Sequence, residues 1–230
     1  MSRDTRNQTV NTKDGIELTM DVHGEGTPVL LVHGLGFTRK KWASQVDALV
    51  GSGCEVATFD LRGFGDSELP ESMYTIETLA QDVEAIRLAA GFDTFHLVGH
   101  SLGGMVALQY AVDHRDRIRS LCLASTSCHN GRRASALGFL LARISELGFD
   151  AAMADPQLQA TLEMLAGSVV KYAPALLEPL RKVTQTPDRA RALAWQSTAG
   201  FSVRSSIGEL NIPAVVMHGD GDMLMPFAAG

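Results

Sequence analysis

This sequence lacks the features that mark several large classes of protein. Its apolar strings, such as Val29–Val32, are far shorter than the roughly 20 residues needed to cross a bilayer, which excludes a transmembrane helix. The polar start MSRDTRNQTVNTKDG has no apolar core, so we expect no secretory signal peptide. The 22 glycines follow no fixed period, which excludes a collagen-like chain.

Cysteine is scarce, and common ligand motifs are missing. The three cysteines, Cys54, Cys122 and Cys128, form no CxxC pair and no zinc pattern, so we expect free thiols in a reducing cytoplasm. The sequence has no G-x-x-x-x-G-K-[ST] phosphate loop and no H-E-x-x-H zinc helix. We therefore expect neither a metal ion nor an organic cofactor.

The sequence has fewer basic than acidic residues: 20 lysines and arginines and 26 aspartates and glutamates give a net charge of −6. This balance argues against a nucleic-acid partner or an anionic membrane surface. The apolar share of 45% and the charged share of 20% are typical of soluble globular proteins and exclude intrinsic disorder. The length of 230 residues fits one large α/β domain, with or without an insertion.

Short apolar strings alternate with helical patterns along the first part of the chain. A hairpin is predicted at 8–23, followed by a buried strand at 28–34 and by further short strands at 55–60, 95–99 and 120–125. Apolar residues recur at helical spacing over 40–50, 76–90 and 103–114. This alternation predicts a doubly wound, mostly parallel sheet with helices on both faces.

The alternation stops at about residue 131 and resumes near residue 212. The stretch 131–211 is rich in alanine and leucine, contains four prolines and offers no clear strand. We expect it to form a helical cap inserted into a core made of 1–130 and 212–230. Residues 212–222, IPAVVMHGDGD, are predicted to return to the core as a strand followed by a loop.

The strongest chemical signal is the G-x-S-x-G pattern at Gly99–Gly103, between the strand FHLV and the helix GMVALQYAVDH. A nucleophilic serine in this pattern occupies a strained turn, and glycines on both sides allow strand and helix to approach. Ser101 is therefore the candidate nucleophile. Acyl transfer also needs two amides that face the oxyanion. We predict those of Leu102 and of Leu35 in the HGLG loop, with Gly36 as the alternative to Leu35.

These motifs resemble those of the serine α/β-hydrolase superfamily, of the esterase and lipase type. The matching segments are LLVHGLG at 30–36, FDLRGFGDS at 59–67, GHSLGG at 99–104 and VMHGDGDMLMP at 216–226. The resemblance implies the α/β-hydrolase fold with a helical cap and a Ser-His-acid triad. It implies Asp222 as the acid, with Asp220 as a less favoured alternative. We also expect Gly34, Gly36 and His100 to line the substrate site, and we assign the turn at 59–67 no catalytic role.

A base is not identified in this sequence. The family's histidine follows one further strand after the acid, whereas the seven histidines here are His23, His33, His96, His100, His114, His129 and His218. We set His218 aside because it ends the strand just before Asp222. We expect that the final strand and helix are missing and that the histidine lies beyond Gly230. The alternative is a complete, non-catalytic member that binds a ligand in the same pocket.

The predicted function is hydrolysis of a small to medium carboxylic ester or lactone through an acyl-enzyme on Ser101. Cleavage of carbon–carbon bonds or acyl transfer by the same triad, and small-molecule binding without catalysis, stay open as alternatives. The only partner expected is this small-molecule substrate. The sequence gives no oligomeric state.

Overall fold

A computed structural model describes residues 5–130, 132–165, 188–220 and 222 of the chain. The chain forms two compact units. The first unit combines Met1–Ser72, Ile76–His129 and Phe201–Gly230, and the second combines Met73–Thr75 with Asn130–Gly200.

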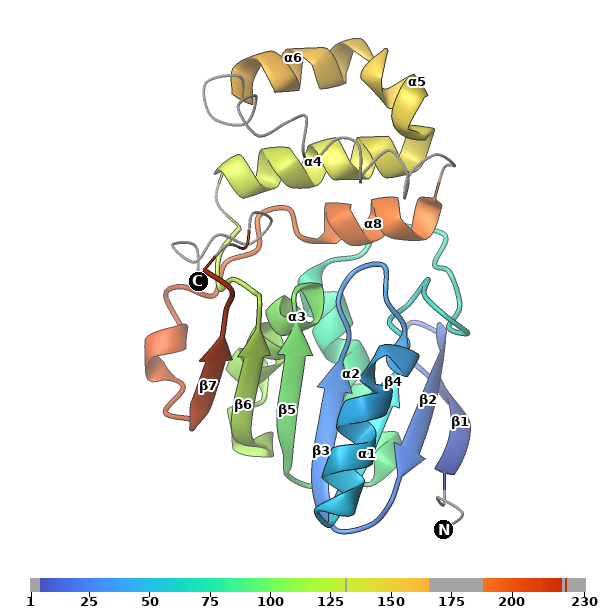
Figure 1. Cartoon of the computed structure of the whole chain (residues 1–230), viewed down its shortest axis with the longest axis vertical. Coiled ribbons are helices and arrows are strands. Elements are labelled where there is room, and N and C mark those ends of the chain that lie inside the picture. The colour runs from blue at the N-terminus through green and yellow to red at the C-terminus, as the bar shows by residue number, and fades with distance from the viewer. Residues whose placement is uncertain (1–4, 131, 166–187, 221, 223–230) are drawn as a thin grey trace. The chain divides into compact units, whose positions relative to one another are not determined.

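The first unit contains a seven-stranded sheet with the strand order β1-β2-β4-β3-β5-β6-β7 (Figure 1). Its strands are β1 (Thr5–Asn11), β2 (Glu17–His23), β3 (Thr27–Val32), β4 (Cys54–Phe59), β5 (Phe95–His100), β6 (Ile118–Ala124) and β7 (Ala214–Met217). The strands β1 and β2 form the predicted hairpin, and β2 also pairs antiparallel with β4. All other neighbouring strands run parallel. The predicted mostly parallel sheet is therefore confirmed.

The burial of each strand follows from its place in the sheet. On β2 the buried residues alternate with half-buried ones, because one face of this antiparallel strand packs on the core. On β3 the run Val29–Val32 is buried throughout, since helices cover a central parallel strand on both faces. The continuous apolar run at 28–34 therefore correctly predicted a strand that is buried on both faces.

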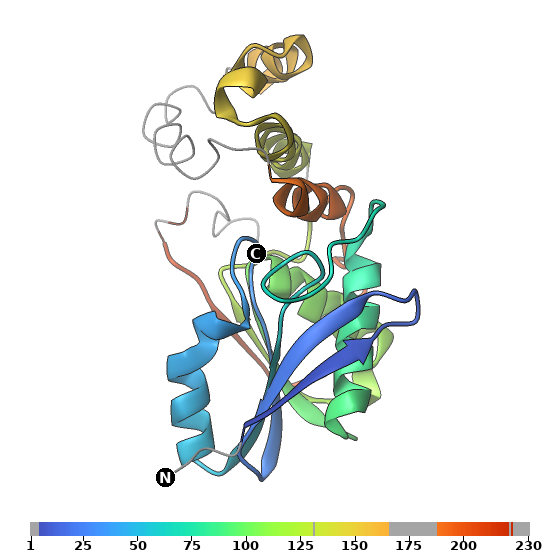
Figure 2. The same ribbon diagram turned by 90° about the vertical axis from the view of Figure 1, so that its right-hand side faces the viewer.

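Helices cover both faces of the sheet, as predicted. Figure 2 shows α1 on one side of the sheet and α2 and α3 on the other. The helical segments of the first unit are η1 (Arg39–Trp42), α1 (Ala43–Gly51), α2 (Ile76–Ala90), α3 (Leu102–Asp113), η2 (Arg115–Arg117) and η3 (Ile207–Glu209). Trp42 and Val46 pack with Val29, Leu31 and Val56 in a core cluster between α1 and the sheet. No helix within the described ranges is long and apolar enough to cross a membrane.

The described part of the second unit is helical. Its helices are α4 (Arg132–Leu147), α5 (Phe149–Met153), α6 (Pro156–Leu165) and α8 (Arg189–Ser197). Ile144, Ala152 and Leu158 form a buried cluster among the first three of these helices. The prediction that this part of the chain serves as a cap stays a prediction.

The return from the second unit to the first lies earlier than the predicted end of the insertion at residue 211. Residues 201–211 belong to the first unit. There the Val203 amide donates to the Cys128 carbonyl at 2.9 Å, and Ser202 forms an isolated β-bridge with His129. Backbone hydrogen bonds do not depend on a repeating pattern of apolar side chains, so the hydrophobic pattern of the sequence did not predict this pairing.

Candidate functional site

Ser101 occupies a strained turn between β5 and α3. Its φ of 53° and ψ of −118° are unusual for a residue with a side chain and cost about 1–3 kcal/mol. Hydrogen bonds hold this conformation on both sides. The Ser101 amide donates to the Ala124 carbonyl at 2.9 Å, and the Ser101 carbonyl accepts from Thr126 Oγ1 at 2.7 Å and from the Met105 amide at 3.2 Å.

The glycines around Ser101 are required by close backbone contacts. A Cβ atom on Gly103 would lie 2.4 Å from the Val32 carbonyl oxygen, and one on Gly99 would lie 2.4 Å from the Gly103 carbonyl oxygen. A Cβ atom on Gly104 would lie 2.5 Å from that of Thr126. Because such distances are far below van der Waals contact, strand and helix meet here only through glycine. The spacing of the G-x-S-x-G pattern therefore has a steric explanation.

The HGLG loop after β3 lies directly against this turn. A Cβ atom on Gly34 would lie 3.1 Å from Cβ of Ser101 and 2.7 Å from Nδ1 of His100. The Phe37 amide donates to the Gly34 carbonyl at 3.2 Å and closes a turn in which Gly36 has a φ of 77°. The structure thus brings the predicted loop residues to the predicted nucleophile.

The two predicted oxyanion amides belong to these two adjacent segments. The Leu35 amide shares a planar trans peptide with the Gly34 carbonyl and points in the opposite direction. Because the Gly34 carbonyl accepts a hydrogen bond within its own loop, the Leu35 amide faces away from that bond. The Leu102 amide belongs to the first residue of α3, and helix geometry gives it no intrahelical acceptor.

His33 links the HGLG loop to the turn that follows β4. Its Nδ1 donates to the Gly34 carbonyl at 2.8 Å, and its Nε2 accepts from the Leu61 amide at 2.9 Å. Only the neutral tautomer with the proton on Nδ1 satisfies both contacts. Burial lowers the pKa of His33 to about 4, so the ring is neutral at pH 7. With both nitrogens engaged, His33 has no free atom with which to accept a proton from Ser101.

His100 lies between the nucleophile turn and the loop residue Phe37, with an edge-on ring contact at 5.8 Å. Burial lowers the pKa of His100, as does the nearby Lys41 ammonium, whereas the Asp222 carboxylate acts in the opposite direction. His100 Nδ1 is buried and has no hydrogen-bond partner among the described residues. His100 also lines an apolar pocket of about 540 Å³ on the α1 face of the sheet. Ser101 is not part of its lining, and we assign this pocket no substrate role.

Asp222 lies just beyond β7 and close to His218. Asp222 Oδ2 is 3.7 Å from Nε2 of His218, and the Asp222 amide donates to the Gly219 carbonyl at 3.2 Å. The alternative acid, Asp220, is exposed. Since β6 separates β7 from β5, the backbones at His218 and Ser101 are about 10 Å apart across the sheet. No group of three or more histidine, cysteine or acidic side chains in the described ranges is arranged to hold a metal ion.

Sequence reasoning missed the turn at 59–67 as a contributor to this region. This turn supplies Leu61 to His33 and Asp60 to Arg39, so it contacts the segment 33–39 at both ends. Sequence reasoning also missed Thr126, whose hydroxyl donates a hydrogen bond to the Ser101 carbonyl. No sequence signal marks the Arg39 and Thr126 contacts, because each depends on how separate loops meet in three dimensions.

The chain is similar to known proteins in sequence and in fold. The sequence profile of a family described as alpha/beta hydrolase fold matches residues 27–170. The chain is 27% identical to proline iminopeptidase of Lactobacillus delbrueckii subsp. bulgaricus, over 90% of this chain and 79% of that protein. It is 38% identical to the putative carbamate hydrolase RutD of Variovorax paradoxus, over 57% of this chain and 51% of that protein. A solved structure of a thermophilic esterase from Thermogutta terrifontis superimposes with a TM-score of 0.73 and 28% identity, over 96% of this chain and 82% of that one.

Proposed function

This chain belongs to the alpha/beta hydrolase fold family, and we propose that it is a serine hydrolase acting on a small to medium carboxylic ester or lactone. The observation that supports this most is the strained Ser101 turn with the HGLG loop packed against it. The relatives include a peptidase, a putative carbamate hydrolase and an esterase, so the choice of substrate class is ours. A serine nucleophile serves acyl transfer in general, and an ester is the simplest acyl donor.

In the proposed mechanism the Ser101 hydroxyl oxygen attacks the substrate carbonyl carbon while a base removes its proton. The carbonyl oxygen becomes an oxyanion, which the Leu35 and Leu102 amides stabilise. The bond to the alkoxide leaving group then breaks, and the protonated base returns its proton to that group. Water attacks the acyl-enzyme in the same way and releases the acid. Loss of one oxyanion donor typically costs about 10²–10³ in kcat.

Asp222 is proposed to orient the histidine base. We assign none of the seven histidines in this sequence as that base. His33 has both ring nitrogens engaged, and the backbone at His218 lies two strands away from Ser101. We further propose that the helical unit, Asn130–Gly200, acts as a cap and that the protein is cytoplasmic, in keeping with its free cysteines.

The test of this proposal is the substitution Ser101→Ala in the protein as its gene encodes it, assayed on activated esters such as p-nitrophenyl acetate. Removal of a triad nucleophile typically costs on the order of 10⁶ in kcat. The matched control is Ser125→Ala. Ser125 also has a positive φ, of 46°, and directly follows β6, which pairs with β5.

We expect Ser101→Ala to abolish ester hydrolysis and to leave the folded structure intact by circular dichroism. Ser125→Ala should keep turnover within about threefold, since we assign Ser125 no contact with substrate. Substitutions away from special structural features usually change the free energy of unfolding by little. Equal turnover in Ser101→Ala and the unaltered protein would show that Ser101 is not the nucleophile and would refute the proposed function.

A further inference from the structure

The segment 33–39, which carries the proposed oxyanion amide of Leu35, is attached at both ends to a single turn of the chain. At its start, His33 accepts a hydrogen bond from the Leu61 amide at 2.9 Å. At its end, the Arg39 amide donates to Asp60 Oδ1 at 2.6 Å. Asp60 and Leu61 are neighbours in the turn that follows β4. The loop therefore spans two fixed points on the same support.

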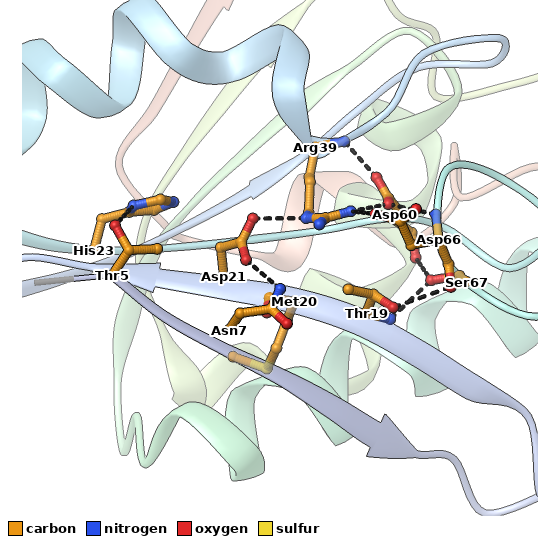
Figure 3. A network of polar contacts seen from close by, with 10 residues as sticks. All are labelled: Thr5, Asn7, Thr19, Met20, Asp21, His23, Arg39, Asp60, Asp66 and Ser67. Carbon is orange, nitrogen blue, oxygen red and sulfur yellow. Dashed lines mark hydrogen bonds and ion pairs between the residues drawn. The ribbon is translucent and has the colours of Figure 1, made fainter.

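The attachment at Arg39 is a network of charged groups, shown in Figure 3. The Arg39 guanidinium donates from Nη1 to Asp60 Oδ2 and, at 2.9 Å, to Asp66 Oδ2. Its Nε donates to Asp21 Oδ2 on β2 at 2.6 Å. One arginine thus joins the end of the loop to the turn and to the neighbouring strand.

Burial makes this network rigid. Asp60 is fully buried and the Arg39 side chain is 8% exposed. The Asp60 carboxylate also accepts from the Asp66 amide at 3.0 Å, and a Cβ atom on Gly65 would lie 2.0 Å from Asp60 Oδ2. Buried charges that are paired and hydrogen-bonded cannot leave their partners without a large desolvation cost. The carboxylate therefore holds one position against the loop.

We propose that Arg39 and Asp60 are positioning residues for the oxyanion loop. Their ion pair, with the His33–Leu61 bond, holds the peptide between Gly34 and Leu35 in the orientation that turns the Leu35 amide toward the developing oxyanion. This inference rests on the proposed serine hydrolase function. It gives the DLRGFGDS turn, to which the sequence assigned no role, an indirect part in the chemistry.

A second buried arginine, Arg62 in the turn itself, provides a matched control. The Arg62 side chain is 3% exposed and donates to Asp82 of α2 at 2.5 and 2.8 Å. It also donates to Asp14 in the hairpin turn at 2.8 Å. Arg62 therefore resembles Arg39 in burial and in pairing with more than one carboxylate, two against the three of Arg39. It anchors α2 and the hairpin rather than the oxyanion loop.

The experiment measures the rate at which a fluorophosphonate labels Ser101 in the full-length unaltered protein, Arg39→Met, Arg62→Met and Arg39→Lys. In this reaction the Ser101 oxygen forms a bond to phosphorus, fluoride leaves, and the serine proton passes to the base. Negative charge grows on the phosphoryl oxygen, which occupies the oxyanion site, so the rate depends on how that site is positioned. All proteins are compared at a temperature at which circular dichroism shows them folded.

We expect Arg39→Met to label about 10- to 100-fold more slowly, because displacement of a catalytic group by about 1 Å can cost 10²-fold. In ester hydrolysis kcat should fall by the same factor while KM changes less than about threefold, as for a group that acts only on the transition state. Arg62→Met should label within about threefold of the unaltered protein. Arg39→Lys keeps the charge but loses the fork geometry, and it should label at least about threefold more slowly.

Unchanged labelling in Arg39→Met overturns the inference, and if that variant does not fold, unchanged labelling in Arg39→Lys does so instead. An equal loss in Arg62→Met also overturns it, because the effect would then follow from the loss of any buried arginine near the turn at 59–67. A different result marks failure of the proposed function itself: the unaltered protein is not labelled at Ser101 at all.

Discussion

At the scale of single residues, His33 connects two loops through both nitrogens of one buried ring. Its Nδ1–H donates to the Gly34 carbonyl, and its Nε2 accepts from the Leu61 amide. If Nε2 were protonated, it could no longer accept from the Leu61 amide, and two N–H donors would face each other. The His33 ring is fully buried, so water could not relieve this conflict. The neutral ring is therefore part of the folded structure.

This leads to a prediction about acid stability. The pKa of His33 is about 4 in the folded chain and about 6.5 in the unfolded chain. Between these values the unfolded chain binds a proton that the folded chain does not, so stability falls as the pH falls from 6.5 to 4. The contribution of His33 over this window is about 3 kcal/mol.

The measurement is an NMR titration of the His33 ring together with urea unfolding between pH 7 and pH 4, repeated for His33→Asn. The variant should start less stable and should lose less free energy of unfolding over the same pH range. A His33 ring that titrates near pH 6.5 in the folded protein would contradict the assigned tautomer and its buried contacts.

At the scale of structural elements, the junction of β5 and α3 is set by glycine. The first turn of α3 packs against the end of β3, where Gly103 meets the carbonyl oxygens of Val32 and His33. The G-x-S-x-G pattern predicted this junction because its steric requirement is local in sequence. The Arg39–Asp60 pair could not be predicted in the same way, because it depends on the register between two parallel strands and on the loops that follow them.

We predict that Gly103→Ala lowers the free energy of unfolding by about 3 kcal/mol, since one added methyl group would lie 2.4 Å from a backbone oxygen that cannot move freely. The matched control is Gly51→Ala at the end of α1, where an added Cβ meets nothing within 4 Å. That change should be neutral or stabilising by up to about 1 kcal/mol, because alanine restricts the unfolded chain.

Both variants are compared with the unaltered protein by urea unfolding monitored by circular dichroism. The comparison separates a steric effect from a general effect of replacing glycine in a helix. A Gly103→Ala protein as stable as Gly51→Ala would show that strand and helix are not in close contact at this junction.

At the scale of the whole molecule, the sequence predicted the architecture better than it predicted the boundaries. Continuous apolar runs and apolar residues at helical spacing predicted the sheet and its helices, and four ordered motifs predicted the family. The sequence predicts an insertion that ends at 211, whereas the second compact unit ends at Gly200, and backbone pairs rather than a hydrophobic pattern hold the return segment. The proposed site depends on both kinds of information: the motifs supply Ser101, and the fold supplies the loop beside it.

Ser101 is proposed to form an acyl-enzyme during turnover, and mass spectrometry can detect that intermediate. The protein as its gene encodes it is mixed with p-nitrophenyl acetate, stopped in acid within the first turnovers, and digested. We predict an acetyl group on the peptide that contains Ser101, present in Ser125→Ala and missing from Ser101→Ala. Ester turnover without any acetylated Ser101 peptide, or acetylation confined to another residue, would show that Ser101 is not the nucleophile.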